Sequence, residues 1–303
     1  MASTPYALTP ASLPTPSAVL EILKPITWFP PMWALACGIV AAGRPWSAHW
    51  WLLPAGVFLA GPLLCGYSQA INDWFDREVD AINEPHRAIP SGRMPGAWGL
   101  YVAIAWSLMS TAFAWTLGPW VFGASLLGLA LAWAYSAPPM RLKENGWLGS
   151  TACAFCYEGL PWITGSALMV GGGAPSSATL TCALLYSAGA VGIMTLNDFK
   201  STNGDRQMGP RSLPVQLGAR RAARLACAGM ALPQVAVAAL LFTWGHAGHG
   251  LAVAGVLLAQ CVLMRRWLTR PRELAPWYNA TGVSLYVSGM MITAFALRAG
   301  AGA

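Results

Sequence analysis

Nine apolar runs, most of them close to 20 residues long, constrain the fold of this 303-residue chain more than any other feature. About 20 apolar residues are enough for a helix to cross the hydrocarbon core of a bilayer. Only 10% of the residues are charged, whereas a soluble domain carries roughly 25%. We therefore expect an all-α integral membrane protein, a single embedded domain over residues 1–303 that begins with a flexible segment at 1–20. The nine expected transmembrane helices lie near residues 26–43, 49–70, 97–117, 119–136, 148–170, 177–196, 222–244, 249–267 and 277–299.

The net charge of +7 reflects topology and does not require a nucleic-acid partner. Of the 18 Lys and Arg residues, all but Arg44 and Arg298 lie near the N-terminus or in loops that follow even-numbered spans. Cytoplasmic loops of membrane proteins carry an excess of Lys and Arg. The pattern therefore predicts that the N-terminus and these loops face the cytoplasm, with the C-terminus on the other side.

Two of the expected cytoplasmic loops repeat one acidic pattern, Asn-Asp-x-x-[Asp/Ser]-x-x-x-Asp. The first copy covers residues 72–80 and the second covers 197–205. Each copy is followed within a few residues by Arg-x-[Ile/Leu]-Pro, beginning at Arg87 and at Arg211. Binding sites inside membranes are often built between such repeats, so we expect two halves around one shared site.

The spacing within each motif predicts a metal site. If the motif continues the preceding helix, its four oxygen-bearing side chains fall within about 100° of one another and share a face. Oxygen ligands without His or Cys suit Mg²⁺, and clustered carboxylates repel one another unless a cation lies among them. Solvated loop helices with capping aspartates are the alternative, which two matching copies on one side of the membrane disfavour. The expected ligands of two Mg²⁺ ions are Asn72, Asp73, Asp76, Asp80, Asn197, Asp198 and Asp205.

With these two motifs after its second and sixth expected spans, the chain resembles the UbiA-type intramembrane prenyltransferases. These are nine-helix bundles with aspartate motifs after the second and sixth helices. The resemblance covers nearly the whole chain and is strongest for the chlorophyll synthase branch. Two positions depart from the pattern, because Ser201 and Asn203 stand where an acid is expected, which makes the second cluster poorer in charge. The stretches that carry the branch resemblance are 24–28, 80–85, 89–92, 135–139, 197–201, 204–207 and 212–215, and those typical of its bacteriochlorophyll-forming members are 28–33, 156–162 and 277–279.

The resemblance implies a Mg²⁺-dependent enzyme of a bacterial inner membrane, cytoplasmic or intracytoplasmic, with its active-site mouth at the cytoplasm. It would transfer a C20 prenyl group, geranylgeranyl or phytyl, from its diphosphate to the propionate carboxylate of bacteriochlorophyllide a. An ionised carboxylate attacks without a general base. Chlorophyllide a, a quinone-precursor ring and haem remain alternative acceptors. A cation-coupled transporter is the non-enzyme alternative, although its charges would be expected nearer the bilayer midplane. Pigment-handling or photosystem-assembly proteins are expected partners that the sequence does not identify.

The expected roles of individual residues follow from this chemistry. Glu158 lies inside the fifth expected span, where a carboxylate is costly unless it is paired or faces water. We expect it to hydrogen-bond a polar substituent of the acceptor as a neutral acid, or else to bond another helix without touching substrate. The expected catalytic residues are Asp76, Asp80, Asp198, Asp205 and Lys200; diphosphate ligands are Arg77, Arg141, Lys143, Lys200, Arg206 and Arg211; acceptor contacts are Tyr157, Glu158 and Trp162.

Overall fold

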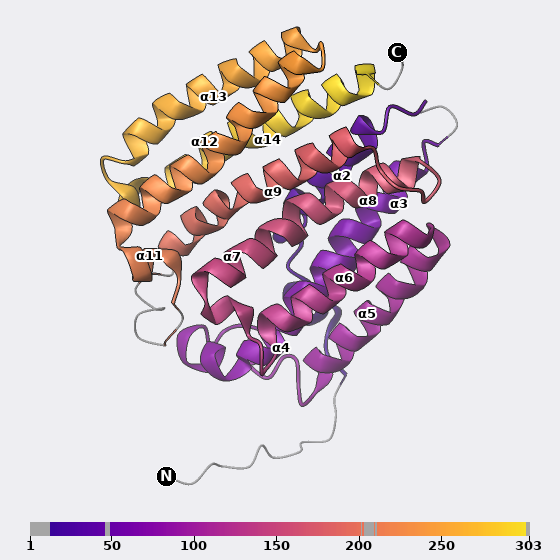
Figure 1. Cartoon of the computed structure of the whole chain (residues 1–303). Coiled ribbons are helices and arrows are strands. Elements are labelled where there is room, and N and C mark those ends of the chain that lie inside the picture. The colour runs from indigo at the N-terminus through magenta and orange to yellow at the C-terminus, as the bar shows by residue number, and fades with distance from the viewer. Residues whose placement is uncertain (1–12, 46–48, 201, 203–208, 210, 301–303) are drawn as a thin grey trace.

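The computed structural model describes residues 13–45, 49–200, 202, 209 and 211–300, and the regular elements among them are helices. The all-α expectation is therefore confirmed (Figure 1). The elements are α1 Pro16–Leu23, η1 Pro25–Thr27, α2 Phe29–Ala41, α3 Leu52–Phe58, η2 Leu59–Cys65, α4 Gly66–Asn83, α5 Trp98–Thr116, α6 Pro119–Ser136, η3 Leu142–Glu144, α7 Gly146–Ala154, η4 Phe155–Gly159, α8 Leu160–Met169, α9 Ser177–Asn197, η5 Asp198–Lys200, α11 Leu213–Leu217, α12 Ala219–Thr243, α13 Ala247–Trp267 and α14 Pro271–Gly300.

Within the described ranges, seven helices are long and apolar enough to cross a membrane. The remaining two expected spans are less regular. The first corresponds to α2, which has 13 residues, and the fifth is shared by α7, η4 and α8, which follow one another without a break from residue 146 to 169. A multi-pass membrane protein is thus confirmed, while the count of nine spans stays a prediction.

The N-terminal segment is more ordered than expected, because residues 16–20 belong to α1. Thr15 caps this helix through a hydrogen bond from the backbone N–H of Ala18 to its side-chain oxygen, and a proline occupies the first turn. Ala18 and Ile22 are buried against a cluster that includes residues of α4 and α5. Residues 16–20 are thus helical with an apolar face packed against α4, and the expected flexibility of residues 1–20 stays a prediction.

The bundle places α12, α13 and α14 on one side and α4, α5 and α6 on the other, with α2, α8 and α9 between them (Figure 1). Close approach of α2 and α8 depends on two glycines. A Cβ atom at Gly38 would lie 2.0 Å from the carbonyl oxygen of Trp162, and one at Gly165 would lie 2.1 Å from that of Leu35. Small residues at such crossings let the backbones of membrane helices touch.

Two π-helical segments, η2 and η4, interrupt the helices that line the interior. Each is associated with a proline, Pro62 within η2 and Pro161 just after η4. A proline lacks an N–H and clashes with the carbonyl four residues earlier, which frees that carbonyl and widens the local turn. Such insertions frequently occur at functional sites, because they redirect the neighbouring side chains.

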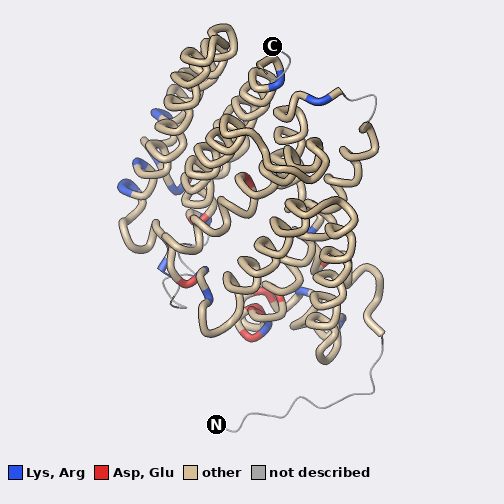
Figure 2. The backbone as a smooth tube through the Cα atoms, turned by 45° about the vertical axis from the view of Figure 1, so that its right-hand side comes forward, with Lys and Arg blue, Asp and Glu red and all other residues tan. Residues whose placement is uncertain are grey.

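Charged residues are segregated along the bundle. Figure 2 shows most acidic and basic positions toward the end opposite the C-terminus, with few at the other end. Arg298 of α14 lies at the sparsely charged end, where its guanidinium donates to the carbonyl oxygen of Arg44 at 3.3 Å. This asymmetry agrees with the basic pattern of the sequence, while the assignment of the charged end to the cytoplasm stays a prediction.

Candidate active site

The first acidic motif lies on α4, which continues the preceding helix without a break to Asn83. Only Asn72 and Asp76 of its metal-ligand candidates line an internal cavity. Asp73 and Asp80 are directed instead toward two cations. Lys24 lies 2.5 Å from Asp73, whose side chain is 6% exposed.

Arg87 completes this arrangement of acids and bases. Its guanidinium lies 2.8 Å from Asp80 and 3.6 Å from Asp73, and it also bonds Glu84. Removal of one member of a buried ion pair typically costs about 3–5 kcal/mol, because the partner is left charged and unpaired. The ion pairs therefore hold the end of α4 rigidly. Asp73 and Asp80, expected to be metal ligands, are paired with Lys24 and Arg87 in this structure and line neither cavity, and their role in metal binding stays a prediction.

The second motif starts where α9 ends. Asn197 closes that helix, and Asp198 and Lys200 form the 3₁₀ turn η5. All three side chains lie along the larger cavity described below. The remaining expected residues of this motif, Asp205 and Arg206 together with Ser201 and Asn203, lie outside the described residues.

Two cavities meet between these motifs. The smaller has a volume of about 500 Å³ and extends between α2, η2, α4, α6 and α8, and its deep end is lined mainly by apolar and small side chains. The larger has a volume of about 1060 Å³ and is bounded by the start of α2, by α7 and η4, and by α9 and α14. Six residues line both cavities and mark their junction: Asp76, Tyr135, Lys143, Cys153, Tyr157 and Lys200.

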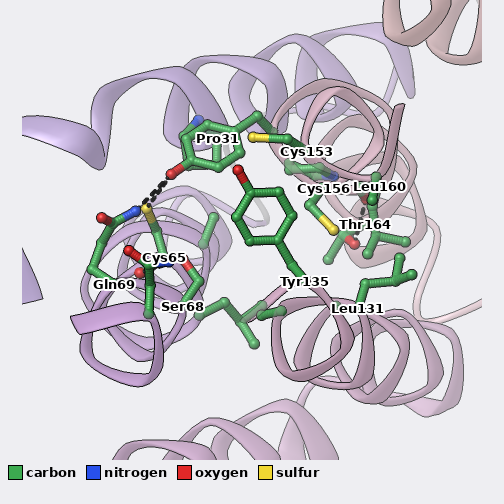
Figure 3. A pocket seen from close by; sticks show the side chains of 18 of the residues that line it. Pro31, Cys65, Ser68, Gln69, Leu131, Tyr135, Cys153, Cys156, Leu160 and Thr164 are labelled. Atoms are coloured by element: carbon green, nitrogen blue, oxygen red, sulfur yellow. Dashed lines mark hydrogen bonds between the residues drawn. The ribbon is translucent and has the colours of Figure 1, made fainter. Parts of the chain in front are cut away.

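Figure 3 shows the smaller cavity from close by. The Tyr135 ring projects into its centre, with Cys65 and Gln69 on one side and Cys153 on the other. The hydroxyl of Tyr157 accepts a hydrogen bond from Gln69 at 2.9 Å and contacts the Cys65 thiol at 3.6 Å. Tyr135, Tyr157, Gln69 and Cys65 thus form a polar collar. This collar separates the charged junction from the apolar deep end of the smaller cavity.

Three cations surround the junction. The ammonium of Lys143 donates to a carboxylate oxygen of Asp76, and Arg141 lies 3.7 Å from the same oxygen. Burial lowers the pKa of Lys143 from its ordinary value of 10.5, and the negative charge of Asp76 opposes that shift. Lys200 reaches the junction from the opposite motif. Together they provide positive charge for an anionic headgroup.

The loop that carries these cations is fixed to the second motif's loop. The backbone N–H of Gly146 donates to the carbonyl of Arg211 at 2.9 Å, and the N–H of Arg211 donates to Glu144 at 2.9 Å. A Cβ atom at Gly146 would lie 2.7 Å from the Arg211 carbonyl oxygen, so only glycine fits this crossing. Arg211 thus contributes through its backbone. Its side chain is exposed and lines neither cavity, and its expected contact with the diphosphate stays a prediction.

Two further expected contacts lie away from the cavities. The Arg77 guanidinium stacks 4.4 Å above the ring of Trp74 and bonds its carbonyl, because its helical position faces outward from the junction. Trp162 is fully buried and stacks on Tyr186 at 5.6 Å between ring centroids. It packs in the core against α9 and lines neither cavity, and its expected contact with the acceptor stays a prediction.

Three residues to which the sequence assigned no function also lie at the site: Lys24, Arg87 and Gln69. Two of them have sequence features that could have marked them. Arg87 begins the first copy of the repeated Arg-x-[Ile/Leu]-Pro, and Lys24 begins a stretch that resembles the chlorophyll synthase branch. Gln69 lies three residues before Asn72 and so shares its side of α4, which places it in the smaller cavity.

The oxygen ligands available at the junction suit a hard divalent cation. Asn72 and Asp76 from α4 face Asn197 and Asp198 from α9 and η5 across the junction, and all offer oxygen, the ligand that Mg²⁺ prefers. No three His, Cys, Asp or Glu side chains converge on one point within the part of the chain that the structure describes. Mg²⁺ is commonly held jointly by one or two protein carboxylates and substrate phosphates, an arrangement for which Asp76 and Asp198 are available among the described residues.

A helical membrane bundle in which two acidic motifs and several cations meet at the junction of two internal cavities has the arrangement that an intramembrane transferase requires. The chain belongs to the UbiA prenyltransferase family, whose profile matches residues 30–290. It is therefore a prenyltransferase.

Relatives and solved structures agree with this assignment. The chain is 55% identical to the bacteriochlorophyll synthase 33 kDa chain of Cereibacter sphaeroides, with 96% of each chain covered. It is 37% identical to the chloroplastic chlorophyll synthase of Arabidopsis thaliana over 91% of this chain and 73% of that protein. A UbiA homologue from Archaeoglobus fulgidus, solved with GPP and Mg²⁺, superposes with a TM-score of 0.70 at 19% identity and covers 89% of this chain and 99% of its own.

Proposed function

We propose that this protein esterifies the propionate of bacteriochlorophyllide a with a C20 prenyl group taken from geranylgeranyl or phytyl diphosphate. The observation that carries the proposal is the meeting of an apolar cavity and a larger chamber at one charged junction. The 55% identity to a bacteriochlorophyll synthase over nearly the whole chain supports the choice of acceptor.

Each cavity suits one substrate. The smaller is lined at depth by Leu35, Leu59, Ala124 and Leu160, which suits a prenyl tail that binds by burial of apolar surface. The larger has the volume and the mixed polar lining that a flat macrocycle with ring substituents needs. The acceptor's carboxylate and the donor's C1 atom then meet at the junction.

Asn72, Asp76, Asn197 and Asp198 would hold two Mg²⁺ ions together with the donor's phosphate oxygens, with Asp205 as a further candidate outside the described residues. Bound Mg²⁺ supplies charge neutralisation on the diphosphate leaving group. Lys143, Arg141 and Lys200 line the larger cavity beside those positions and take the remaining phosphate oxygens. When diphosphate binds, it replaces Asp76 as the anionic partner of Lys143.

In the reaction, a carboxylate oxygen of the acceptor forms a bond to C1 of the prenyl group while the bond from C1 to the phosphate oxygen breaks. The electron pair of the broken bond leaves with the diphosphate. The acceptor is already ionised, so no proton has to be removed, and none of the four histidines is among the residues that line the two cavities. Tyr135 and the apolar walls keep water from the allylic carbon.

The charged junction lies at the end of the bundle where basic residues gather, which supports a cytoplasmic mouth in a nine-span bundle of the bacterial inner membrane. A cation-coupled transporter would place its paired charges near the bilayer midplane. The location of these motifs at the helix ends favours the enzyme, because a charged headgroup can remain at the membrane edge while its tail enters the bilayer.

The test is pigment esterification by membranes that contain the protein. Bacteriochlorophyllide a or chlorophyllide a is supplied with geranylgeranyl or phytyl diphosphate, with and without Mg²⁺, and the products are separated by chromatography. We expect Mg²⁺-dependent ester from bacteriochlorophyllide a at the higher rate. Faster reaction of chlorophyllide a would show that chlorophyllide a, not bacteriochlorophyllide a, is the preferred acceptor. Ester formation without any divalent cation would refute the metal-dependent mechanism.

A further inference from the structure

Glu158 is an intramembrane acid to which the proposed reaction assigns no function. Its side chain is 3% exposed, and one carboxyl oxygen, Oε2, is sealed from solvent without a hydrogen-bond partner among the described residues. A carboxyl group buried in this way inside a membrane protein is expensive, and such residues are usually functional. A carboxyl group in this state needs a partner that the described residues do not supply.

The position of Glu158 selects the cavity that such a partner would occupy. Tyr157 and Glu158 are adjacent in η4, where Pro161 disturbs the helical hydrogen bonds. Tyr157 lines both cavities, and its hydroxyl is occupied by Gln69. Glu158 lines only the larger cavity. It therefore faces the chamber assigned to the acceptor and not the prenyl tail.

The depth of Glu158 identifies which part of the acceptor it would meet. Of the two junction residues on this helical stretch, Cys153 lies five residues and Tyr157 one residue before Glu158, which therefore lies at the inner edge of the junction. The reacting propionate must stay at the junction beside Asp76 and Lys143. What extends to Glu158 is then the ring system, whose polar groups there are carbonyl oxygens, which only accept hydrogen bonds.

The protonation state follows from the surroundings. Among the described residues, Glu158 forms no salt bridge. An unpaired carboxylate is disfavoured there, whereas a neutral carboxylic acid has one O–H donor to offer.

We propose that Glu158 is a specificity residue whose protonated carboxyl donates a hydrogen bond to a carbonyl oxygen conjugated with the acceptor's macrocycle. The inference rests on the proposed function. Bacteriochlorophyllide a carries an acetyl group and a ring ketone of this kind, whereas chlorophyllide a has a vinyl group in place of the acetyl. A donor aligned with the acetyl oxygen would favour bacteriochlorophyllide a, because loss of the acceptor group leaves a buried donor unpaired.

The kinetic test compares Glu158→Leu, which removes the donor, with Glu158→Gln, which keeps an N–H donor of similar shape. We expect Glu158→Leu to raise KM for the acceptor about tenfold with kcat nearly unchanged, and Glu158→Gln to stay within about threefold of the parent. Gln260→Leu is the matched control, because Gln260 is a fully buried membrane residue that lines neither cavity, and it should leave KM unaltered. An unchanged KM in Glu158→Leu would overturn the inference.

Two measurements keep the inference testable if Glu158→Leu fails to fold. The parent protein is assayed with acceptors that lack the acetyl oxygen or carry the ring ketone reduced to an alcohol, and one of them should show the same rise in KM. Resonance Raman spectra of the bound acceptor should show a lowered carbonyl stretching frequency in the parent and in Glu158→Gln. Unshifted carbonyl frequencies, or equal KM for all acceptors, would refute the hydrogen bond. Failure of the parent to esterify any tetrapyrrole would instead refute the proposed function.

Discussion

The depth of the smaller cavity should determine the length of prenyl chain that the enzyme uses. The α6 face that lines it carries Ala124, Gly128 and Tyr135, and the small residues lie at its deep end. Gly128 is seven residues from Tyr135, which places it about 10 Å below the centre of the polar collar along the helix. A Cβ at Gly128 would lie 3.3 Å from a methyl of Leu160, a flexible side chain, so a larger residue can be accommodated at the expense of the cavity.

The substitution Gly128→Leu should obstruct the deep end and exclude the last part of a C20 chain. Each buried methylene contributes about 0.8 kcal/mol, so exclusion of three or four such groups removes about 3 kcal/mol, a factor of roughly 100 in kcat/KM. A C10 donor does not reach the substituted position, so its kcat/KM should change little. The assay measures kcat/KM for geranylgeranyl and geranyl diphosphate with the same acceptor, and the ratio of the two values should fall about a hundredfold.

Gly123→Leu provides the control for this prediction. Gly123 lies on the same helix, a Cβ there would meet nothing within 4 Å, and the residue lines neither cavity. Its C20-to-C10 ratio should equal that of the parent. An unchanged ratio in Gly128→Leu, with folded protein, would show that the tail does not occupy the smaller cavity.

Three further predictions concern metal binding, packing and pH. Asp76→Asn should lower kcat/KM at least about a hundredfold and raise the Mg²⁺ concentration needed for half-maximal rate. Glu78→Gln, at an exposed position of the same helix, should leave both quantities unchanged. Equal effects of the two substitutions would refute the assignment of Asp76 as a metal ligand. Gly38→Ala should lower thermal stability in detergent by about 1–3 kcal/mol, because its Cβ would clash with a backbone carbonyl, and Gly255→Ala, which meets open space, should not. The hydrogen bond from Arg93 lowers the pKa of Glu21 below its ordinary value of 4.5, so the stability that Glu21 contributes is present above that pH and is lost as the pH falls below it. The acid sensitivity of unfolding should therefore decrease in Glu21→Gln, and an identical pH profile would contradict this.

The sequence predicted the membrane class and the helix that carries the first acidic motif, because each depends on local spacing. The second motif departs from the prediction, because α9 ends at Asn197 and Asp198 begins a 3₁₀ turn. Hydrophobic runs determine spans, and an offset of four residues determines that Asn72 and Asp76 lie on one side of α4. It did not predict that Asp73 and Asp80 are held by Lys24 and Arg87. A helical face about 100° wide can border two environments, and only tertiary packing decides which residues meet each one.

The π-helical segments mark a second limit of prediction from the sequence. A proline within an apolar run is compatible with a kink, a break or a π-helical turn, since each relieves the same clash. The consequence at η4 is large, because Tyr157 lies at the junction of the two cavities, Glu158 lines only the larger cavity and Trp162 is buried in the core. Three residues expected at one surface thus occupy three environments. The position of α1 similarly depends on a groove against α4 that no local pattern specifies.

The most direct test of the central claim follows the oxygen atoms of the acceptor. Bacteriochlorophyllide a is labelled with a heavy oxygen isotope at both oxygens of its propionate and converted with geranylgeranyl diphosphate and Mg²⁺, and the ester and the released diphosphate are analysed by mass spectrometry. Attack of the carboxylate on C1, with the diphosphate leaving at the charged junction, predicts that the ester retains both labelled oxygens and that the diphosphate contains none. Transfer of one labelled oxygen to a phosphate would show that the carboxylate is activated by phosphorylation, and would contradict the account.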